Sequence, residues 1–177
     1  MPRLFAAISP PDDVRDALAL CRGGLEGARW VDPADYHVTL RFIGDVDARV
    51  GDRVAGELDA INAPAFELEL DGFGSFGNKA PHAVHLKVKP SAELVALNGA
   101  CEAACRRVGL APETRNFAPH ITIARLRGIR SREAAAWLDA RQYVGPRTFP
   151  VRSFGLFTAR PGGGGPYGEA VRFPLDD

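Results

Sequence analysis

The sequence predicts one compact unit of mixed helices and strands, organised as two similar lobes, and three observations carry this prediction. The chain has 177 residues, which is within the usual size of one domain and long enough to bury a hydrophobic core. Segments with alternating polar and apolar residues are interleaved with segments of helical periodicity. The order helix, connector, strand occurs once in each half, and both of these strands carry a His-x-Thr motif. We therefore expect residues 1–177 to form a single bilobal domain.

The first half of the chain contains strands that alternate with helices. The expected elements are a strand at residues 4–8, a helix from Asp12 or Asp13 to Gly23, a strand at residues 36–43 and a helix at residues 47–61. Pro10 and Pro11 end the first strand, which is short and apolar. Strict alternation predicts the second strand, and an apolar stripe at helical spacing predicts the second helix. In that second strand His37, Thr39 and Arg41 form the polar face.

The second half repeats this order and adds strands at its end. The expected elements are strands at residues 66–70 and 82–88, a helix from Ser91 to Gly109, a strand at residues 120–126, a helix at residues 131–139, and strands at residues 149–158 and 170–173. Glycine-rich residues 72–81 and a turn at residues 160–167 connect strands. Ser131 is expected to cap the short helix, and Glu133 is the acidic residue of its first turn.

Each His-x-Thr motif places an imidazole and a hydroxyl on one side of a strand. Residues two apart on a strand project to the same face, so His37 lies beside Thr39. The same holds for His120 and Thr122. Two lobes related by a pseudo-twofold axis bring both pairs into one cleft. Near neutral pH one imidazole can be neutral while the other is protonated, which divides base and acid work between them. The hydroxyls suit non-bridging phosphate oxygens, and the scheme needs no metal or other cofactor.

The charge of the chain excludes a broad electrostatic attraction to nucleic acid. The sequence has 22 basic and 22 acidic residues and a formal net charge of zero, so we expect no long duplex or single-strand footprint. The arginines are nevertheless uneven, because Arg125, Arg127, Arg130 and Arg132 closely follow the second histidine motif. Two interpretations stay open for this cluster: it faces one or two phosphates, or it is a solvated basic loop.

The sequence also predicts where the protein is found. The apolar run at residues 1–8 is too short for a signal peptide, and no stretch approaches the roughly 20 apolar residues of a membrane span. The 3 cysteines form no disulfide or zinc pattern. We expect a cytoplasmic protein with no membrane association and no obligate protein partner, present as a monomer.

The sequence resembles the two-histidine phosphoesterases over nearly its whole length. Within them it is similar to the bacterial and archaeal RNA 2′,3′-cyclic phosphodiesterases, also called LigT-like 2′-5′ RNA ligases. The specific part is the pair of histidine blocks, WVDPADYHVTLRFIGDV and FAPHITIARL. Three further blocks agree with the family: RLFAAISPPDDVRDAL, FGSFGNKAPHAVHL and FGLFTARPGGGGPYGEAVRFPL.

The resemblance implies a fold, an activity and a set of site residues. The fold is α+β and bilobal, with two antiparallel sheets around a central groove and helices outside. The activity is hydrolysis of a 2′,3′-cyclic phosphate, on an RNA end or a nucleotide, to a 2′-phosphate. By motif, His37 is the proton donor and His120 the proton acceptor. Thr39 and Thr122 bind the phosphate.

The resemblance also places Arg125 against the bound nucleotide and Phe42 against its base. Each lies five residues after a histidine, an odd offset that puts it on the opposite face of a regular strand. Either a bulge follows each motif, as Gly44 and Gly128 allow, or these side chains lie elsewhere, with Phe42 in the core and Arg125 on the surface.

Other interpretations compete with this one. The same residues would serve the reverse reaction, a 2′-5′ RNA ligase, and a nucleotide-binding module without turnover would keep the same groove. A metal-dependent hydrolase is poorly supported, because only Asp35 and Asp45 flank the first motif and no acid flanks the second. His82 and His85 are three apart in an expected strand, so we expect them on opposite faces, where they make a poor chelate.

Overall fold

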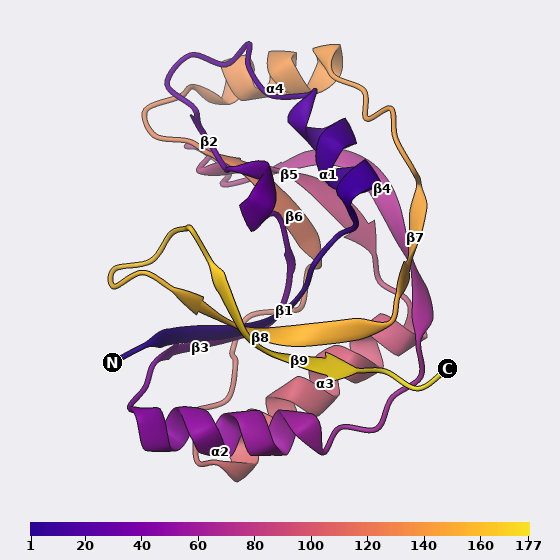
Figure 1. Ribbon diagram of the computed structural model, residues 1–177. Coiled ribbons are helices and arrows are strands. Elements are labelled where there is room, and N and C mark those ends of the chain that lie inside the picture. Colours follow the sequence, from indigo (N-terminus) through magenta and orange to yellow (C-terminus); the bar gives the residue numbers. More distant parts are fainter.

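The computed structural model describes residues 1–177 and consists of nine strands in one strongly curled antiparallel sheet, with helices outside it (Figure 1). The strands are β1 (Arg3–Ile8), β2 (Arg29–Trp30), β3 (Val38–Asp45), β4 (Phe66–Phe76), β5 (Ala83–Lys89), β6 (His120–Arg125), β7 (Thr148–Val151), β8 (Ser153–Ala159) and β9 (Gly168–Pro174). The helices are α1 (Asp12–Ala19), α2 (Ala48–Asp59), α3 (Ala92–Arg107) and α4 (Ser131–Ala140), with a short 3-10 helix at Pro33–Asp35. The α+β class predicted from the sequence is confirmed.

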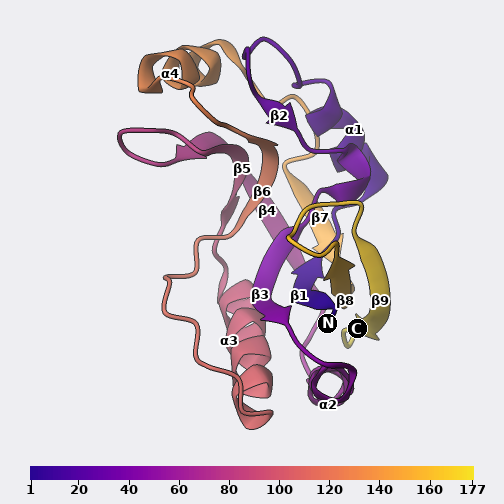
Figure 2. The same cartoon turned by 90° about the vertical axis from the view of Figure 1, so that its left-hand side faces the viewer.

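The sheet has two halves that meet at β3 and β6. Its strand order is β7-β4-β5-β6-β3-β1-β8-β9, with β2 beside β6. We call β7, β4, β5 and β6 the middle half, because they come from the middle of the chain, and β3, β1, β8 and β9 the outer half. One residue pair, Val38 with Ile121, joins the halves. Figure 2 shows the sheet turned by 90° from the view of Figure 1. The bilobal arrangement is therefore confirmed, and the two expected sheets are continuous through this pair.

Each half of the sheet is covered in part by a helix that follows a strand of the other half. Helix α1 follows β1 of the outer half but lies with α4 over the middle half, where Ala17 packs against Gly145 (Figure 1). Helix α3 follows β5 of the middle half but packs on β3, where the Asn98 amide donates to the carbonyl of Leu40 at 2.8 Å. The two halves are interlocked by this exchange.

Two helix starts agree with the sequence because capping side chains occupy them. The Asp47 carboxylate accepts a hydrogen bond from the N–H of Val50 at 2.8 Å at the start of α2. The Ser91 hydroxyl accepts from the N–H of Leu94 at 3.1 Å at the start of α3. Both contacts satisfy an N–H that has no partner within its own helix.

The expected cap of α4 is wrong. Ser131 is the first helical residue, and its hydroxyl donates to the carbonyl of Lys79 at 3.0 Å instead of accepting from the helix. The carboxylate of Glu133, in the first turn of the helix, accepts a hydrogen bond from the N–H of Arg130 at 3.2 Å. Arg130 is the residue just before the helix. The contact of Ser131 ties the β4–β5 loop to the start of α4.

The strand expected at residues 149–158 is two strands in different halves of the sheet. β7 pairs with β4, β8 pairs with β1, and the chain crosses between the halves at Arg152. A sequence signal for this break exists, because the buried positions change parity from Phe149 and Val151 to Phe154 and Leu156. The structure also extends β4 to Phe76, into the stretch expected to be a connector, and adds the two-residue strand β2.

The hydrophobic core runs through both halves of the sheet. One cluster includes apolar side chains of β1, β3, β5 and β6 together with those of all four helices. A smaller cluster of Phe5, Ala7 and Phe157 lies apart from it, with Tyr167 packed against it. In the fold as a whole, no helix is both long and apolar enough to cross a membrane.

Candidate active site

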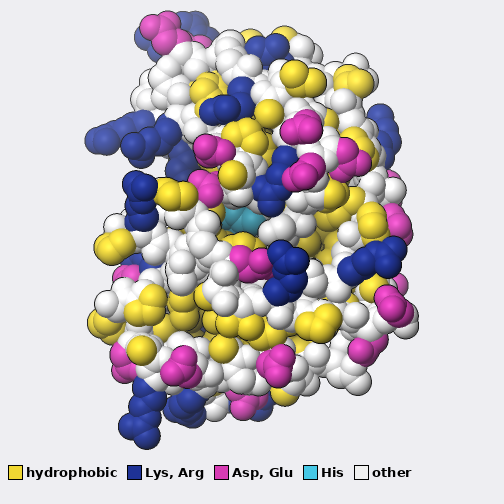
Figure 3. Space-filling view, in the orientation of Figure 1, with side chains coloured by type: hydrophobic (Ala, Val, Ile, Leu, Met, Phe, Trp, Pro, Cys, Tyr) yellow, Lys and Arg dark blue, Asp and Glu magenta, His cyan; other side chains and the backbone are white.

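A groove of about 820 Å³ runs across the junction of the two halves. Its walls contain every site residue that the sequence predicted, namely His37, Thr39, Phe42, His120, Thr122 and Arg125. Figure 3 shows histidine atoms near the middle of this face, recessed between the surrounding side chains. The expectation that two His-x-Thr strands share one cleft is therefore met by the geometry.

A bulge in β3 brings Phe42 to the groove face. Thr39 lies opposite Ala7 of β1 and Phe42 lies opposite Phe5, and Leu40 is the extra residue between the two pairings. Phe5 and Ala7 are two apart on β1, so they share a face, and their partners share it too. Phe42 is 41% exposed and lies in the groove wall rather than in the core.

A matching bulge in β6 brings Arg125 to the same face as Thr122. Thr122 lies opposite His85 of β5 and Arg125 lies opposite Ala83, with Ile123 as the extra residue. In both motifs the extra residue stands three positions after the histidine, so the two lobes share this irregularity as well as the motif. The bulges that turn Phe42 and Arg125 to the groove therefore occur earlier than Gly44 and Gly128, inside each strand, and β3 has a second register shift next to Gly44, where Ile43 is unpaired.

Both histidines are held by the main chain in the same way. Nδ1 of His37 lies 2.8 Å from the carbonyl oxygen of Asp35, and Nδ1 of His120 lies 2.7 Å from that of Ala118. A carbonyl oxygen only accepts, so Nδ1 carries a hydrogen in both rings. Nε2 is then the nitrogen that gains and loses a proton in each imidazole.

The surroundings favour the neutral form of both imidazoles. The pKa of His37 is lowered to about 4, chiefly by burial and to a smaller extent by the charges of His120 and Arg125, while the hydrogen bond to Asp35 acts in the opposite direction. Burial also lowers the pKa of His120, with the Arg125 charge acting in the same direction. Both imidazoles are therefore neutral near pH 7 in the free protein, and each can accept a proton at Nε2.

His37 is enclosed by aromatic rings and by the glycine-rich turn. The ring of Phe5 lies 4.8 Å from it and the ring of Tyr167 lies 5.2 Å from it, edge to face. The N–H of Tyr167 donates to the carboxylate of Asp35 at 3.0 Å. Gly165 leaves space for this carboxylate, since an added Cβ would lie 1.9 Å from its Oδ2. The turn thus fixes the residue whose carbonyl orients His37.

A third histidine, His85, lies behind His120. Its ring is stacked on Phe76 at 4.1 Å and meets the ring of His120 at 5.1 Å. His85 is 4% exposed, and its Nδ1 has no hydrogen-bond partner. Burial lowers its pKa to about 4, and the charges of His120 and Lys87 add to this effect. Its position opposite Thr122 puts it on the groove side of the sheet.

The expectation that His82 and His85 point to opposite faces is wrong. His82 precedes β5, so strand alternation does not apply to it, and both rings stack against Phe76, at 6.2 Å and 4.1 Å. His82 is exposed and lines the groove. One sequence signal could have placed His85 on the groove side. It lies two residues after Ala83 in the same strand, so the two share a face, and Ala83 lies opposite Arg125.

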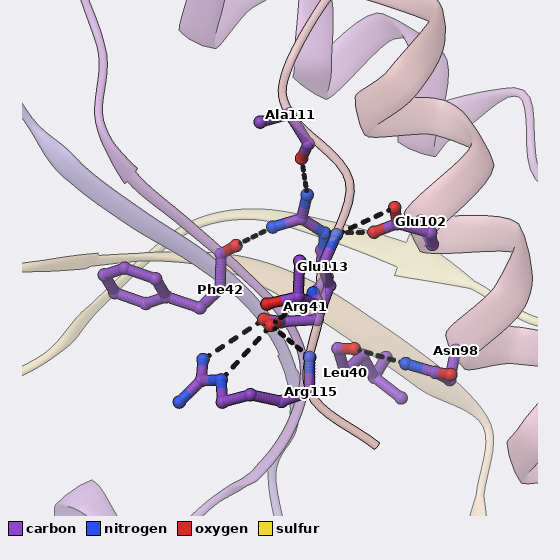
Figure 4. Close-up of polar contacts among 9 residues, drawn as sticks. Leu40, Arg41, Phe42, Asn98, Glu102, Ala111, Glu113 and Arg115 are labelled. Carbon is purple, nitrogen blue, oxygen red and sulfur yellow. Dashed lines mark hydrogen bonds and ion pairs between the residues drawn. The ribbon is translucent and has the colours of Figure 1, made fainter. Parts of the chain in front are cut away.

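The alternation predicted that Arg41 shares a strand face with His37 and Thr39, and this prediction is wrong. The bulge at Leu40 turns Arg41 to the other side of β3, where it is buried, with 8% exposure. Its guanidinium donates to the Glu102 carboxylate of α3, to the carbonyl of Phe42 and to the carbonyl of Ala111 at 2.6 Å (Figure 4). Arg41 therefore anchors α3 and the following connector to β3 instead of facing His37 and Thr39.

The connector between α3 and β6 lines the groove near Glu102 and contains a second ion pair. The carboxylate of Glu102 also accepts from the N–H of Glu113 at 3.1 Å, and Glu113 pairs with Arg115 at 3.1 Å (Figure 4). The Arg115 pair holds the pKa of Glu113 at about 2. Every charged side chain named here at this end of the groove has an opposite charge beside it.

The fold and the site together define the class of the protein. A curled antiparallel sheet whose two halves meet at paired His-x-Thr strands, with both imidazoles facing one groove, is the architecture of a two-histidine phosphoesterase. The chain belongs to the 2′-5′ RNA ligase superfamily, whose family model matches residues 10–162.

Named relatives and solved structures agree with this membership. The chain is 34% identical over 128 residues to an RNA 2′,3′-cyclic phosphodiesterase of Geobacillus stearothermophilus, which covers 68% of this chain and 41% of the relative. It is 35% identical over 105 residues to one of Aeropyrum pernix, with 58% and 60% covered. The chain thus spans less than two thirds of the length of these relatives. A crystal structure of E. coli LigT complexed with 3′-AMP is 27% identical, with a TM-score of 0.79 and full coverage of both chains.

Proposed function

We propose that the protein is an RNA 2′,3′-cyclic phosphodiesterase, which opens a cyclic phosphate end to a 2′-phosphate by acid and base work of His37 and His120. The matched geometry of the two imidazoles carries this proposal, because each is fixed through Nδ1 and leaves Nε2 for proton transfer. The names of the relatives and the 3′-AMP complex of LigT support a nucleotide as the ligand.

The reaction follows from this geometry. One imidazole takes a proton from water at Nε2, and the water oxygen forms a bond to phosphorus. The P–O3′ bond breaks, and the other imidazole gives its Nε2 proton to the departing O3′. One ring has then gained the proton that the other lost, and the phosphate remains on O2′. Thr39, Thr122 and Arg125 stabilise the charge that grows on the non-bridging oxygens, and Phe42 offers its exposed ring to the base.

We assign His37 as the acid and His120 as the base. In the free protein the pKa of His37 is lowered to about 4, so His37 becomes an effective acid only when the bound phosphate anion raises its pKa. A cyclic phosphate with sulfur in place of the 3′ bridging oxygen tests this assignment, because a thiolate leaves without a proton. His37→Ala should regain turnover on this analogue and His120→Ala should not. The opposite pattern would exchange the two roles.

The function itself is tested with cyclic mononucleotides and cyclic-ended oligonucleotides. Turnover should yield only 2′-phosphate products, and each alanine variant of the two histidines should lose at least about 100-fold in kcat. Products with a 3′-phosphate, or wild-type turnover by either variant, would contradict the proposal. Binding of the nucleotide without turnover would instead support a binding module.

Two further experiments concern the same reaction. No step above uses a metal ion, so turnover should survive exhaustive treatment with a chelator, and a loss restored by a divalent metal would contradict the scheme. The family is named for 2′-5′ ligation, which is the reverse reaction with a 5′-hydroxyl in place of water. Labelled RNA halves incubated with the protein reveal it as a longer product. A cytoplasmic location and a monomeric state stay predictions.

A further inference from the structure

The two histidine motifs share their main-chain support but differ in one side chain beside it. In each motif the residue two positions before the histidine holds the imidazole through its carbonyl oxygen. That residue is Asp35 before His37 and Ala118 before His120. Both of these residues line the groove. The first motif therefore has a carboxylate at the position where the second motif has a methyl group.

The Asp35 carboxylate is held in place by the turn between β8 and β9. Its Oδ1 accepts a hydrogen bond from the N–H of Tyr167 at 3.0 Å. Its Oδ2 lies so close to Gly165 that a Cβ added there would overlap with it. None of the ion pairs of the protein includes this carboxylate. Its negative charge is therefore fixed beside the groove and is not neutralised by a neighbouring side chain.

This carboxylate is the main difference between the charges that surround the two imidazoles. The charges that act on His37 are those of His120, Arg125 and Asp35. The charge that acts on His120 is that of Arg125, and the neutral ring of His85 lies behind it. The other aromatic rings packed against the two histidines are Phe5, Tyr167 and Phe76. A negative charge thus acts on His37, and none acts on His120.

The sign of each effect follows from the charge that causes it. Burial is the largest effect on both rings and lowers the pKa of each, and the charge of Arg125 acts in the same direction. The carbonyl hydrogen bonds raise the pKa of both histidines, whereas the Asp35 charge raises only that of His37. A phosphate anion between the imidazoles would act on both rings and would not distinguish them. The Asp35 carboxylate does distinguish them, because it favours a proton on His37.

We propose that Asp35 is the positioning residue that gives His37 the role of acid: its fixed carboxylate favours the Nε2 proton that His37 donates to the departing O3′, while Ala118 leaves His120 to act as the base. This inference rests on the proposed function. Asp35 acts through His37 and not on the substrate, since an ionised carboxylate has no proton to donate and repels a phosphate anion.

The charge of Asp35 can be removed while its hydrogen bond is kept. In Asp35→Asn the amide oxygen still accepts from the N–H of Tyr167, so the turn keeps its contact. The matched control is Asp32→Asn, which removes a charge from the exposed Asp32 of the same connector. Asp32 accepts from the N–H of Ala34 at 2.9 Å, and asparagine caps equally well.

A titration of the histidine side chains by NMR tests the electrostatic step without substrate. The pKa of His37 should be lower in Asp35→Asn than in the wild type, and it should move more than that of His120. The Asp32→Asn control should leave both values unchanged. An unchanged pKa of His37 in Asp35→Asn, or an equal shift of both histidines, would overturn the inference.

Kinetics with two leaving groups test the assignment of the acid. With a 2′,3′-cyclic mononucleotide, Asp35→Asn should lower kcat at least about fivefold and should not raise KM, since it removes a negative charge from the groove wall. With sulfur at the 3′ bridging position the leaving thiolate needs no proton, so kcat should stay within about twofold of the wild type. Asp32→Asn should match the wild type on both substrates.

The outcomes of these experiments separate the inference from the proposed function. Equal losses of kcat on the oxygen and sulfur substrates would show that Asp35 supports the groove and not the acid, and would overturn the inference. If the wild type opens no cyclic phosphate, the proposed function fails. The NMR titration then still decides whether Asp35 favours the protonated form of His37.

Discussion

Replacing His85 by leucine should change how the stability of the protein depends on pH. His85 is buried, its Nδ1 has no partner, and its pKa is lowered from 6.5 to about 4, chiefly by burial. The pKa of His85 is lower in the folded protein than in the unfolded chain. The part of the free energy of unfolding that depends on neutral His85 is therefore fully present above pH 6.5 and is lost as the pH falls toward 4. The variant retains His120 and Lys87, the charged groups that face this position.

The size of the effect follows from the difference between the two pKa values. One proton bound by the unfolded chain and not by the folded protein is worth about 1.4 kcal/mol for each pH unit. Integrated between pH 7 and pH 5, His85 alone removes about 2 kcal/mol from the free energy of unfolding. Over this pH range the free energy of unfolding of the leucine variant should fall by about 2 kcal/mol less than that of the wild type, whatever its value at pH 7.

Urea denaturation at a series of pH values measures this difference. The free energy of unfolding of the variant minus that of the wild type should rise by about 2 kcal/mol as the pH falls from 7 to 5. The exposed His82, changed to leucine in the same way, is the matched control for the loss of an imidazole outside the buried position. A constant difference between His85→Leu and wild type over this range would refute the reasoning.

Three other predictions follow from the site and its supports. The profile of kcat/KM against pH should be bell-shaped with its maximum on the acid side of pH 6.5, because the pKa values of both groove histidines are lowered in the free protein; an optimum above pH 7.5 would contradict this. Gly165→Ala should lower kcat at least tenfold with little loss of stability, because its Cβ displaces the Asp35 carboxylate; thermal unfolding separates this from misfolding, and wild-type kcat would argue against the contact. Glu102→Gln should lower the free energy of unfolding by about 2 kcal/mol, because it leaves the buried Arg41 without its counter-charge; a urea titration with an unchanged midpoint would exclude this role.

The sequence predicts the parts of the fold that depend on local pattern. Strand alternation and helical stripes locate most elements within a few residues, and the repeated motif indicates two lobes with His37 and His120 between them. These features are local because the period of side chains along a strand or helix is set by the backbone itself. The prediction that residues 1–177 are one domain stays a prediction.

The positions of Phe42 and Arg125 in the groove depend on pairing between strands that are distant in the sequence. A local sequence pattern does not predict such pairing. The bulges at Leu40 and Ile123 are defined by β1 and β5, and neither position carries a glycine that would indicate an irregular strand. The same bulge moves Arg41 out of the polar face where alternation had placed it. The break at Arg152 is similar, because the strands on either side of it belong to different halves of the sheet.

The exchange of helices between the halves has a consequence for how the protein loses its structure. If α1 separates from the middle half, the chain that leads to His37 loses its support, and if α3 separates from β3, the chain that leads to His120 does so too. Neither half is complete without a segment that belongs to the other. The spacing of His37 and His120 should therefore persist up to the main unfolding transition and disappear within it, so that loss of the proposed activity on heating and global melting are one cooperative event.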